Sequence, residues 1–324
     1  MAWKVRPAMR PETQLHYDAV SATAQGGRDR QEDAVVLNFP IGSSHGFAVL
    51  ADGMGGHAAG DVASNIVVTE VFSELKMQGE NPSGLEQDIN ATLHAAIADA
   101  NACIKYVSRC KPEQDVMGTT VLAPVVFEDR LYWISVGDSP LWLFRDGELQ
   151  RLNANHSMAP EIDQMLQAGL IDAEEAQSHP DRHCLTSVLM GEEIAKIDYS
   201  EAPTHLKPGD VILAASDGLE FLEEEEISSI VRAHRHQPSA VLAQALMDAI
   251  HALGDPEQDN VAICAIRVLF SDWPEKAVNL NENGGALRSD FGEADEDLSN
   301  ALTVMSHKDR SGSRVICISK KVSL

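Results

Sequence analysis

Aromatic residues and basic charge are both scarce in this chain of 324 residues. Phe, Trp and Tyr make up 5% of it, and 25 Lys and Arg stand against 50 Asp and Glu, a formal net charge of −25. A surface of this kind repels phosphates, so the composition argues against general nucleic-acid binding. No uncharged apolar run approaches the roughly 20 residues of a membrane helix. The first residues have no apolar core typical of a signal peptide, so we expect neither a membrane span nor export.

Cysteine is also sparse, and its spacing forms no pattern. The five cysteines are odd in number and scattered, without a CxxC pair: Cys103, Cys110, Cys184, Cys264 and Cys317. This favours reduced thiols in a cytoplasmic protein and speaks against a zinc site or a disulfide scaffold. The hydrophobic share of 44% and charged share of 23% are ordinary for a globular protein. The length allows one large domain, with or without an appendage.

Apolar runs recur from about Gln14 to Val268 and predict strands and paired helices. The expected helices are Ala58–Met77, Leu85–Val107, Glu224–His234 and Ser239–Leu253. The expected strands are His16–Thr23, Ala34–Phe39, Phe47–Leu50, Thr119–Phe127, Leu131–Val136, Leu141–Phe144, Leu149–Leu152, Val211–Ala215 and Val261–Val268. An Asp-Gly turn at Asp146 predicts a hairpin. The order fits an α+β fold, with sheets packed on each other and paired helices outside.

Three segments fall outside this regular pattern. Residues 1–13 are expected to be a short lead-in to a domain that covers residues 14–268. Asn153–Asp198 is polar, with short helical pieces, and is expected to be a surface insertion. Trp273–Arg314 is rich in Gly, Asn, Asp, Glu and Ser, so residues 269–324 are expected to form a mobile tail. The last residues, SRVICISKKVSL, predict a short edge strand.

Three carboxylates stand at the ends of apolar strands. Asp52 follows one such run and precedes Gly53, Asp217 follows another, and Asp259 stands directly before a third. A carboxylate in this position is held by the sheet and still reaches solvent, and an adjacent glycine lets backbone carbonyls approach a ligand closely. Several converging carboxylates repel one another unless a cation lies between them. Oxygen ligands of this kind select Mg²⁺ or Mn²⁺ over zinc or copper.

Two glycine-rich segments fit a reaction of phosphate. Gly26–Asp33 places Arg28 and a pair of acids beside a glycine turn, and guanidinium groups bind phosphoryl oxygens well. Taken alone, this segment is more typical of a cluster of loop salt bridges. Asp52–Gly60 reads DGMGGHAAG at the start of an expected helix, where phosphate can bind. It matches neither the Walker lysine motif nor the dinucleotide motif GxGxxG.

The ordered set of segments resembles a known family. GRDRQEDA, VLADGMGGHAAGDVAS, DVMGTTVL, WISVGDSPLWLFRDGELQRL, NHSM, HPDRHCLTSVLMG, LKPGDVILAASDGL and QDNVAI follow one another in the chain. Together they resemble the metal-dependent protein phosphatase family (PPM, type 2C) in its compact bacterial form, over about Gln14–Val268. The resemblance implies a central antiparallel β-sandwich flanked by pairs of antiparallel helices, with a metal cluster at one end of the sandwich.

The same resemblance implies the ligands of two metal ions, Mg²⁺ or Mn²⁺. Asp52 resembles the carboxylate that bridges both ions, and the Gly53 carbonyl looks like a ligand of one of them. Glu32, supported by Asp33, looks like a ligand of the second ion. Asp217 and Asp259 look like ligands of the first ion.

Further roles follow by resemblance for residues around these ligands. Asp115 sits where the family often has an acid that helps to hold a third metal. Arg28 resembles the arginine that clamps the substrate phosphate, and His57 lies near the position of the family's proton donor. Asp138, in VGDS, looks structural. Three departures from the family's pattern, at Pro140, at Asn155 and in LTSVLMG, lie in or beside the expected surface insertion.

The resemblance implies a serine/threonine phosphoprotein phosphatase in which a metal-bridging hydroxide attacks phosphorus. Its expected partners are phosphorylated proteins and a cognate Ser/Thr kinase, with the enzyme itself a monomer. Two other functions stay open at this point. One is a catalytically silent pseudophosphatase that only binds phosphoproteins, and the other is a hydrolase of a small phosphate ester.

Overall fold

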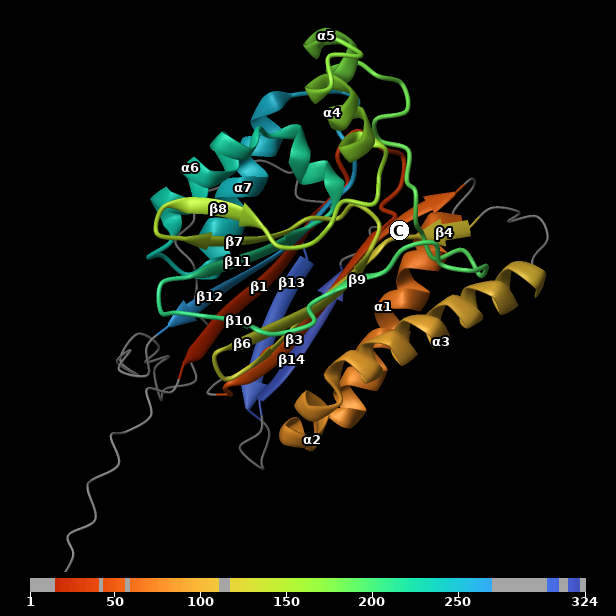
Figure 1. Cartoon of the computed structure of the whole chain (residues 1–324). Coiled ribbons are helices and arrows are strands. Elements are labelled where there is room, and N and C mark those ends of the chain that lie inside the picture. The colour runs from red at the N-terminus through yellow and green to blue at the C-terminus, as the bar shows by residue number, and fades with distance from the viewer. Residues whose placement is uncertain are drawn as a thin grey trace, which may run out of the picture. The chain divides into compact units, whose positions relative to one another are not determined.

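The computed structural model describes residues 15–40, 43–55, 59–110 and 117–269, and the backbone of 302–308 and 314–320. The chain divides into two compact units, Met1–Trp273 and Pro274–Leu324. The larger unit contains two antiparallel sheets with helices on their outer faces, as Figure 1 shows.

One sheet has five strands and carries the end of the regular domain. Its spatial order is β1 (His16–Ala24), β12 (Val261–Leu269), β11 (Val211–Ala215), β7 (Leu141–Arg145) and β8 (Glu148–Arg151). The alternation of side chains explains how it packs on both faces. In β12, Val261, Ile263 and Ala265 face one hydrophobic cluster, whereas Cys264 and Ile266 face another.

The other sheet has seven strands and carries the N-terminal half of the domain. Its main path is β10 (Thr204–His205), β6 (Arg130–Val136), β5 (Val121–Phe127), β3 (His45–Gly55) and β2 (Asp33–Asn38). β4 (Met117–Thr119) pairs with β3, and β9 (Asp198–Tyr199) pairs with β6. Leu122 and Leu131 of this sheet share a buried cluster with Leu143 and Ile212 of the five-stranded sheet, so the two sheets form a sandwich.

Helices cover both outer faces of the sandwich. α1 (Ala59–Gln78) and α3 (Ile89–Cys110), joined by α2 (Pro82–Gln87), pack against the seven-stranded sheet. α6 (Glu224–His234) and α7 (Ser239–Leu253) pack against the five-stranded sheet. The predicted α+β sandwich with paired helices is thereby confirmed.

Several predicted boundaries are wrong, each for a local reason. The helix expected over Leu85–Val107 is two helices, because Asn81 caps α2 with its side chain and Asp88 ends it. β3 continues beyond Leu50 through Gly55, because residues 53–55 pair with β4. Asp52 and Gly53 therefore lie within a strand rather than after it. The strand expected over Thr119–Phe127 is interrupted at Thr120, between β4 and β5.

The polar insertion contains α4 (Ala159–Gln167) and α5 (Ala173–Gln177), in line with the short helices expected there. In the smaller unit, β13 (Leu302–Lys308) pairs with β14 (Arg314–Lys320). A strand was predicted at the position of β14, whereas β13 lies where no regular element was predicted. The domain boundaries themselves stay predictions. In the described part of the chain, no helix is long and apolar enough to cross a membrane.

Candidate metal centre

One cavity at an end of the sandwich collects most of the acids that the sequence singles out. Its volume is about 950 Å³. Asp52 of β3 lies there beside Asp217, which follows β11, and Asp259, which precedes β12. The full set of acids that line it is Asp29, Glu32, Asp52, Asp138, Asp217 and Asp259. These residues meet because the carboxyl ends of β3 and β11 and the starts of β2 and β12 lie at the same end of the two sheets.

The backbone of Asp52 is held by two threonines of the segment GTT. The Asp52 N–H donates to Thr120 Oγ1 at 3.0 Å. The Asp52 carbonyl accepts from Thr119 Oγ1 at 2.8 Å and from the Thr120 N–H at 2.9 Å. Both threonines are buried. The interruption at Thr120 thus fixes the strand position from which the Asp52 side chain enters the cavity.

Two glycines allow α1 to begin directly against this strand. A Cβ on Gly53 would lie 2.2 Å from the Gly60 carbonyl oxygen, and one on Gly60 would lie 2.9 Å from Cδ of Glu32. Any larger residue at either position would push the helix away from β3. The Gly53 N–H donates to the Glu32 carbonyl at 3.2 Å, which brings Glu32 and Asp52 into the same wall of the cavity.

Asp33 is buried between the two sheets, where Ser216 Oγ donates to its Oδ2 at 2.7 Å. Burial raises its pKa to about 7, and the nearby charges of Asp217 and Asp259 act in the same direction. Ser216 is fully buried and also accepts from the Ala262 N–H at 2.8 Å. This serine therefore joins β2 of one sheet to the segments that carry Asp217 and Asp259 in the other.

The remaining acids repel one another. Burial, and then the neighbouring Asp33 and Asp217, raise the pKa of Asp52 well above its usual range. Burial and the charge of Asp259 raise the pKa of Asp217, and burial raises that of Glu32. A divalent cation would relieve this repulsion. The donors are all oxygens, carboxylates with the Gly53 carbonyl, which is the set that Mg²⁺ and Mn²⁺ prefer.

Arg28 brings positive charge to the rim of the same cavity. Its guanidinium is 2.5 Å from Oδ2 of Asp259, and 57% of its side chain is exposed. An exposed guanidinium beside converging carboxylates can bind the oxygens of a phosphate group that enters from solvent. Cations held by the acids and the exposed guanidinium of Arg28 would together favour the binding of a phosphorylated ligand.

Comparison with known proteins decides the family. The protein phosphatase 2C profile matches residues 27–250, more than half of the chain. This chain belongs to the protein phosphatase 2C family. The serine/threonine protein phosphatase PstP of Mycobacterium tuberculosis is 33% identical over 225 residues, which are 69% of this chain and 40% of PstP. The serine/threonine phosphatase stp of Listeria monocytogenes is 32% identical over 189 residues, 58% of this chain and 72% of stp.

Solved structures of such phosphatases have the same fold. The crystal structure of Mycobacterium tuberculosis PstP superposes with a TM-score of 0.64 at 31% identity, covering 79% of this chain and 99% of that one. The catalytic domain of PstP in complex with two manganese ions gives 0.63 at 29% identity, with the same coverage. The chain spans only about two fifths of the full length of PstP.

The protein phosphatase 2C site also has members that the sequence prediction missed. Asp138 lines the cavity, and burial raises its pKa to about 7, with Asp217 and Glu220 adding to the shift. Its structural role stays a prediction. His183 and Met190 of the insertion line the cavity as well. Both residues are distant in sequence from the acids, and no sequence pattern predicts that they line the cavity. His57 and Asp115 lie outside the described residues, so their predicted roles stay predictions.

The acids are not yet arranged as ligands of one ion. Among the described residues, no three acidic, histidine or cysteine side chains form a ready ligand set. Two of the acids interact instead with other side chains: Asp259 with Arg28, and Asp33 with Ser216.

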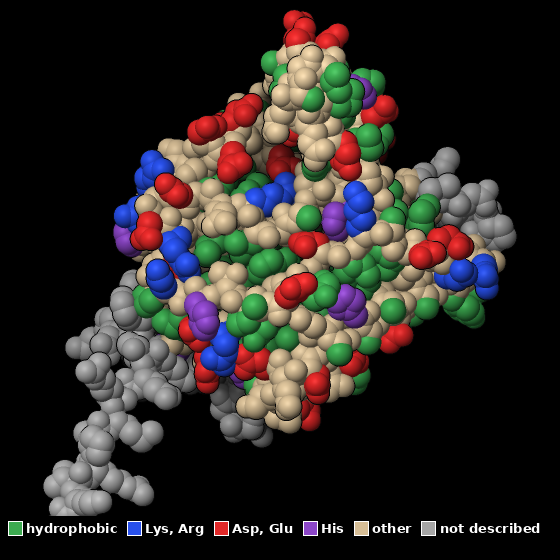
Figure 2. Space-filling model, viewed as in Figure 1, with side chains coloured by type: hydrophobic (Ala, Val, Ile, Leu, Met, Phe, Trp, Pro, Cys, Tyr) green, Lys and Arg blue, Asp and Glu red, His purple; other side chains and the backbone are tan. Residues whose placement is uncertain are grey.

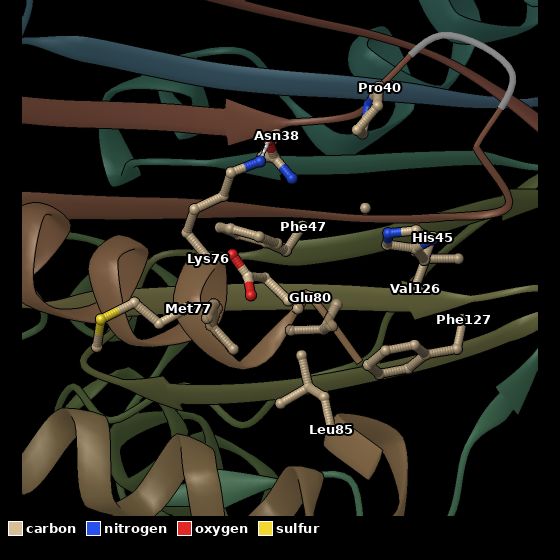
Figure 3. Close-up of a pocket in the computed structure, with 14 residues that line it drawn as sticks. Asn38, Pro40, His45, Phe47, Lys76, Met77, Glu80, Leu85, Val126 and Phe127 are labelled. Atoms are coloured by element: carbon tan, nitrogen blue, oxygen red, sulfur yellow. Dashed lines mark hydrogen bonds between the residues drawn. The ribbon is translucent and has the colours of Figure 1, made fainter. Parts of the chain in front are cut away.

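A smaller cavity of about 320 Å³ lies at the far end of β3, beside the end of α1 (Figure 3). Its floor is apolar, with Phe47, Leu85 and Phe127, and Lys76 Nζ donates to Asn38 Oδ1 at 3.1 Å on its rim. It has no cluster of acids comparable with the cavity around Asp52. We therefore assign the chemistry of this family member to the acidic cavity.

Proposed function

We propose that this protein is a Mg²⁺- or Mn²⁺-dependent phosphatase that hydrolyses phosphoserine and phosphothreonine in proteins. The observation that carries the proposal is the acidic cavity with Arg28 on its rim, in a chain of the protein phosphatase 2C family. Its relatives PstP and stp are named serine/threonine phosphatases, and PstP binds two manganese ions.

The residues divide into those that hold cations and those that hold substrate. We propose that Asp52 contacts both ions, that Asp217, Asp259 and Glu32 complete their coordination, and that Asp33 supports Glu32. The carbonyl of Gly53, which also lines the cavity, would be a further oxygen ligand. When bound, the ions supply Lewis acidity and a water that loses its proton near neutral pH.

Arg28 binds the phosphoryl oxygens and stabilises the charge that grows on them during the reaction. The departing serine or threonine oxygen needs a proton. His183, which lines the cavity, is the described histidine in a position to provide it. The phosphorylated protein is the product of a serine/threonine kinase, so we expect a cognate kinase among the partners, and we expect the phosphatase to act as a monomer.

The proposal is tested by comparing two substrates with Mn²⁺ present. A phosphothreonine peptide and a generic aryl phosphate should both be hydrolysed, and chelation by EDTA should stop both reactions. Turnover of the aryl phosphate alone would favour a hydrolase of small esters. Binding of the phosphopeptide without turnover of either substrate would indicate a pseudophosphatase.

A further inference from the structure

The segment that carries Arg28 and Glu32 belongs to no strand. β1 ends at Ala24 and β2 begins at Asp33, so the peptide groups of residues 25–32 have no ladder partners. Backbone N–H and C=O groups that leave solvent require other partners. Residues 25–30 are exposed, and Gln31 and Glu32 are half-buried. The position of the segment, and of the Arg28 guanidinium on it, therefore depends on contacts with residues outside the two strands.

The side chain of Asn260 supplies three of these partners. Its Nδ2 donates to the Gln25 carbonyl at 2.7 Å and to the Arg30 carbonyl at 2.8 Å. Its Oδ1 accepts from the Glu32 N–H at 2.7 Å. Asn260 is buried, with 5% of its surface exposed. A short carboxamide offers an acceptor and two donors at once, whereas an ionised Asp has no donor and Ala has neither group.

The turn before β12 contacts the segment of residues 25–32 directly. The Gly27 N–H donates to the Gln258 carbonyl at 2.7 Å. A Cβ on Gly26, whose φ is +62°, would lie 2.3 Å from the carbonyl oxygen of Asp259. Gly26 and Gly27 are thus packed, backbone against backbone, on the turn that carries Asp259. A loss of the Asn260 bonds would leave this contact without its side-chain anchor.

We propose that Asn260 is a positioning residue for phosphate-ester hydrolysis. It holds residues 25–32 against the turn of Asp259, and so sets where the Arg28 guanidinium and the Glu32 carboxylate stand. All three of its side-chain bonds go to this segment, so it acts through Arg28 and Glu32. The inference rests on the proposed function, since the reaction it serves is the one proposed above.

The first test measures the segment itself and requires no activity. In Asn260→Ala, the hydrogen-bonded amides among residues 26–32, those of Gly27 and Glu32, should exchange with deuterium about tenfold faster than in the wild type. Asn153→Ala is the matched control. Asn153 is also 5% exposed and makes three side-chain bonds, to Ser135 Oγ, the Ser139 carbonyl and the Leu141 N–H. Its loss should leave exchange at residues 26–32 unchanged.

The second test measures hydrolysis of an aryl phosphate at saturating Mn²⁺. Asn260→Ala should raise the KM, and the inhibition constant of inorganic phosphate, by about tenfold, with a smaller effect on kcat. The factor should shrink to less than about twofold in an Arg28→Ala background, because the effect that passes through Arg28 is then absent and saturating Mn²⁺ offsets a displaced Glu32. Asn153→Ala should show no such coupling to Arg28. If Asn260→Ala does not fold, the neutral and smaller Asn260→Ser takes its place, with the same expectation.

The outcomes separate this inference from the proposed function. If the wild type hydrolyses no phosphate ester with Mn²⁺, the proposed function fails and the inference fails with it, whatever the exchange shows. If the wild type is active, but the exchange at residues 26–32 is unchanged, the inference is overturned and the function stands. The inference is equally overturned if Asn260→Ala multiplies the KM by the same factor with and without Arg28.

Discussion

Acidic residues gather at both ends of the sandwich, but the two ends differ in how many of them pair with arginines. Of the six described acids that line the cavity, only Asp259 has an arginine partner, Arg28. At the end away from the cavity, Arg130 pairs with Glu86, Glu128 and Asp129, and Arg145 is 2.6 Å from Asp210. At the cavity, six acids line the space together with Arg28, Arg30 and His183. Figure 2 shows basic and acidic side chains side by side over much of the visible face.

The difference in how the acids are paired indicates a different role for each end of the sandwich. A buried acid with a guanidinium partner is neutralised within the protein, so the removal of either partner is destabilising. A buried acid beside other acids is destabilising by itself, which is why burial and like charges raise the pKa of Asp33 and Asp138 to about 7. Such an arrangement is typical of a functional site. Changes at the two ends should therefore have opposite consequences for stability and activity.

Asp52→Asn should show the largest effect. The amide has no charge with which to hold two cations, so hydrolysis should fall by at least about a thousandfold, or 4 kcal/mol of activation energy. Because the change also removes a charge that repels Asp33 and Asp217, the EDTA-treated protein should melt no lower than the wild type. Turnover with Mn²⁺ and thermal melting with EDTA check both points. Activity within about tenfold of the wild type would contradict the assignment.

The pH dependence of stability should distinguish the ends without any substrate. The ordinary pKa of Asp is 3.8, whereas Asp33 and Asp138 have pKa values of about 7 in the folded protein. Between these values the folded chain binds more protons than the unfolded chain. Stability is therefore greatest at the acid side of this window and is lost as the pH rises through the folded pKa.

Denaturant titrations of the EDTA-treated protein across this window measure the effect. The free energy of unfolding should fall from the lower to the higher pH, and Mn²⁺ should reduce the fall because it replaces the protons. A free energy that rises over the same interval would show that the cavity acids are not the groups that govern it.

Asp210→Asn should affect the other end alone. Asp210 accepts from the Arg145 Nε at 3.0 Å and from the Lys207 N–H at 2.7 Å, and its side chain is only 3% exposed. Removal of its charge takes the charged partner from Arg145, which keeps its bond to the His205 carbonyl. The protein should therefore lose about 3 kcal/mol of stability. Hydrolysis should stay within about twofold at a temperature where the variant is folded. A large loss of activity would mean that the two ends are not independent.

Periodicity and turns were sufficient to predict most of the fold. The helices α6 and α7 have the predicted bounds, because their apolar faces pack on one sheet and Pro238 and Gly254 mark the ends of α7. The break at Asp88 was not predictable from period alone, since apolar residues continue on both sides of it. β3 extends beyond its apolar run because β4, 62 or more residues later in the chain, supplies its partners.

The residues of the candidate site also divide into those that the sequence predicts and those that it does not. Asp52, Asp217 and Asp259 were predicted because a carboxylate next to a strand and a glycine, or an asparagine, is a local pattern. Ser216 and Asn260 were not, because their roles depend on bonds to Asp33 and Gln25, more than 180 residues away. Single-sequence patterns cannot identify partners at that distance. The position of Asp138 in the cavity wall was not predictable for the same reason, since its neighbour Asp217 comes from another strand end.

Arg28→Ala should have the smallest effect on stability and a limited effect on activity. The Arg28 side chain is 57% exposed, and that of Asp259 is 28% exposed, so their ion pair contributes at most about 1 kcal/mol to folding. The ion pair of Arg145 differs, because its partner Asp210 is buried. The loss of charged hydrogen bonds to a phosphate group is worth about 1.5–3 kcal/mol, which should raise the KM for phosphate esters by about ten- to a hundredfold.

Mn²⁺ affinity should stay nearly unchanged, because Asp259 loses only a competing cation. Steady-state kinetics and calorimetric titration with Mn²⁺ measure the two quantities separately. A collapse of metal affinity would place Arg28 in the cation site rather than at the substrate.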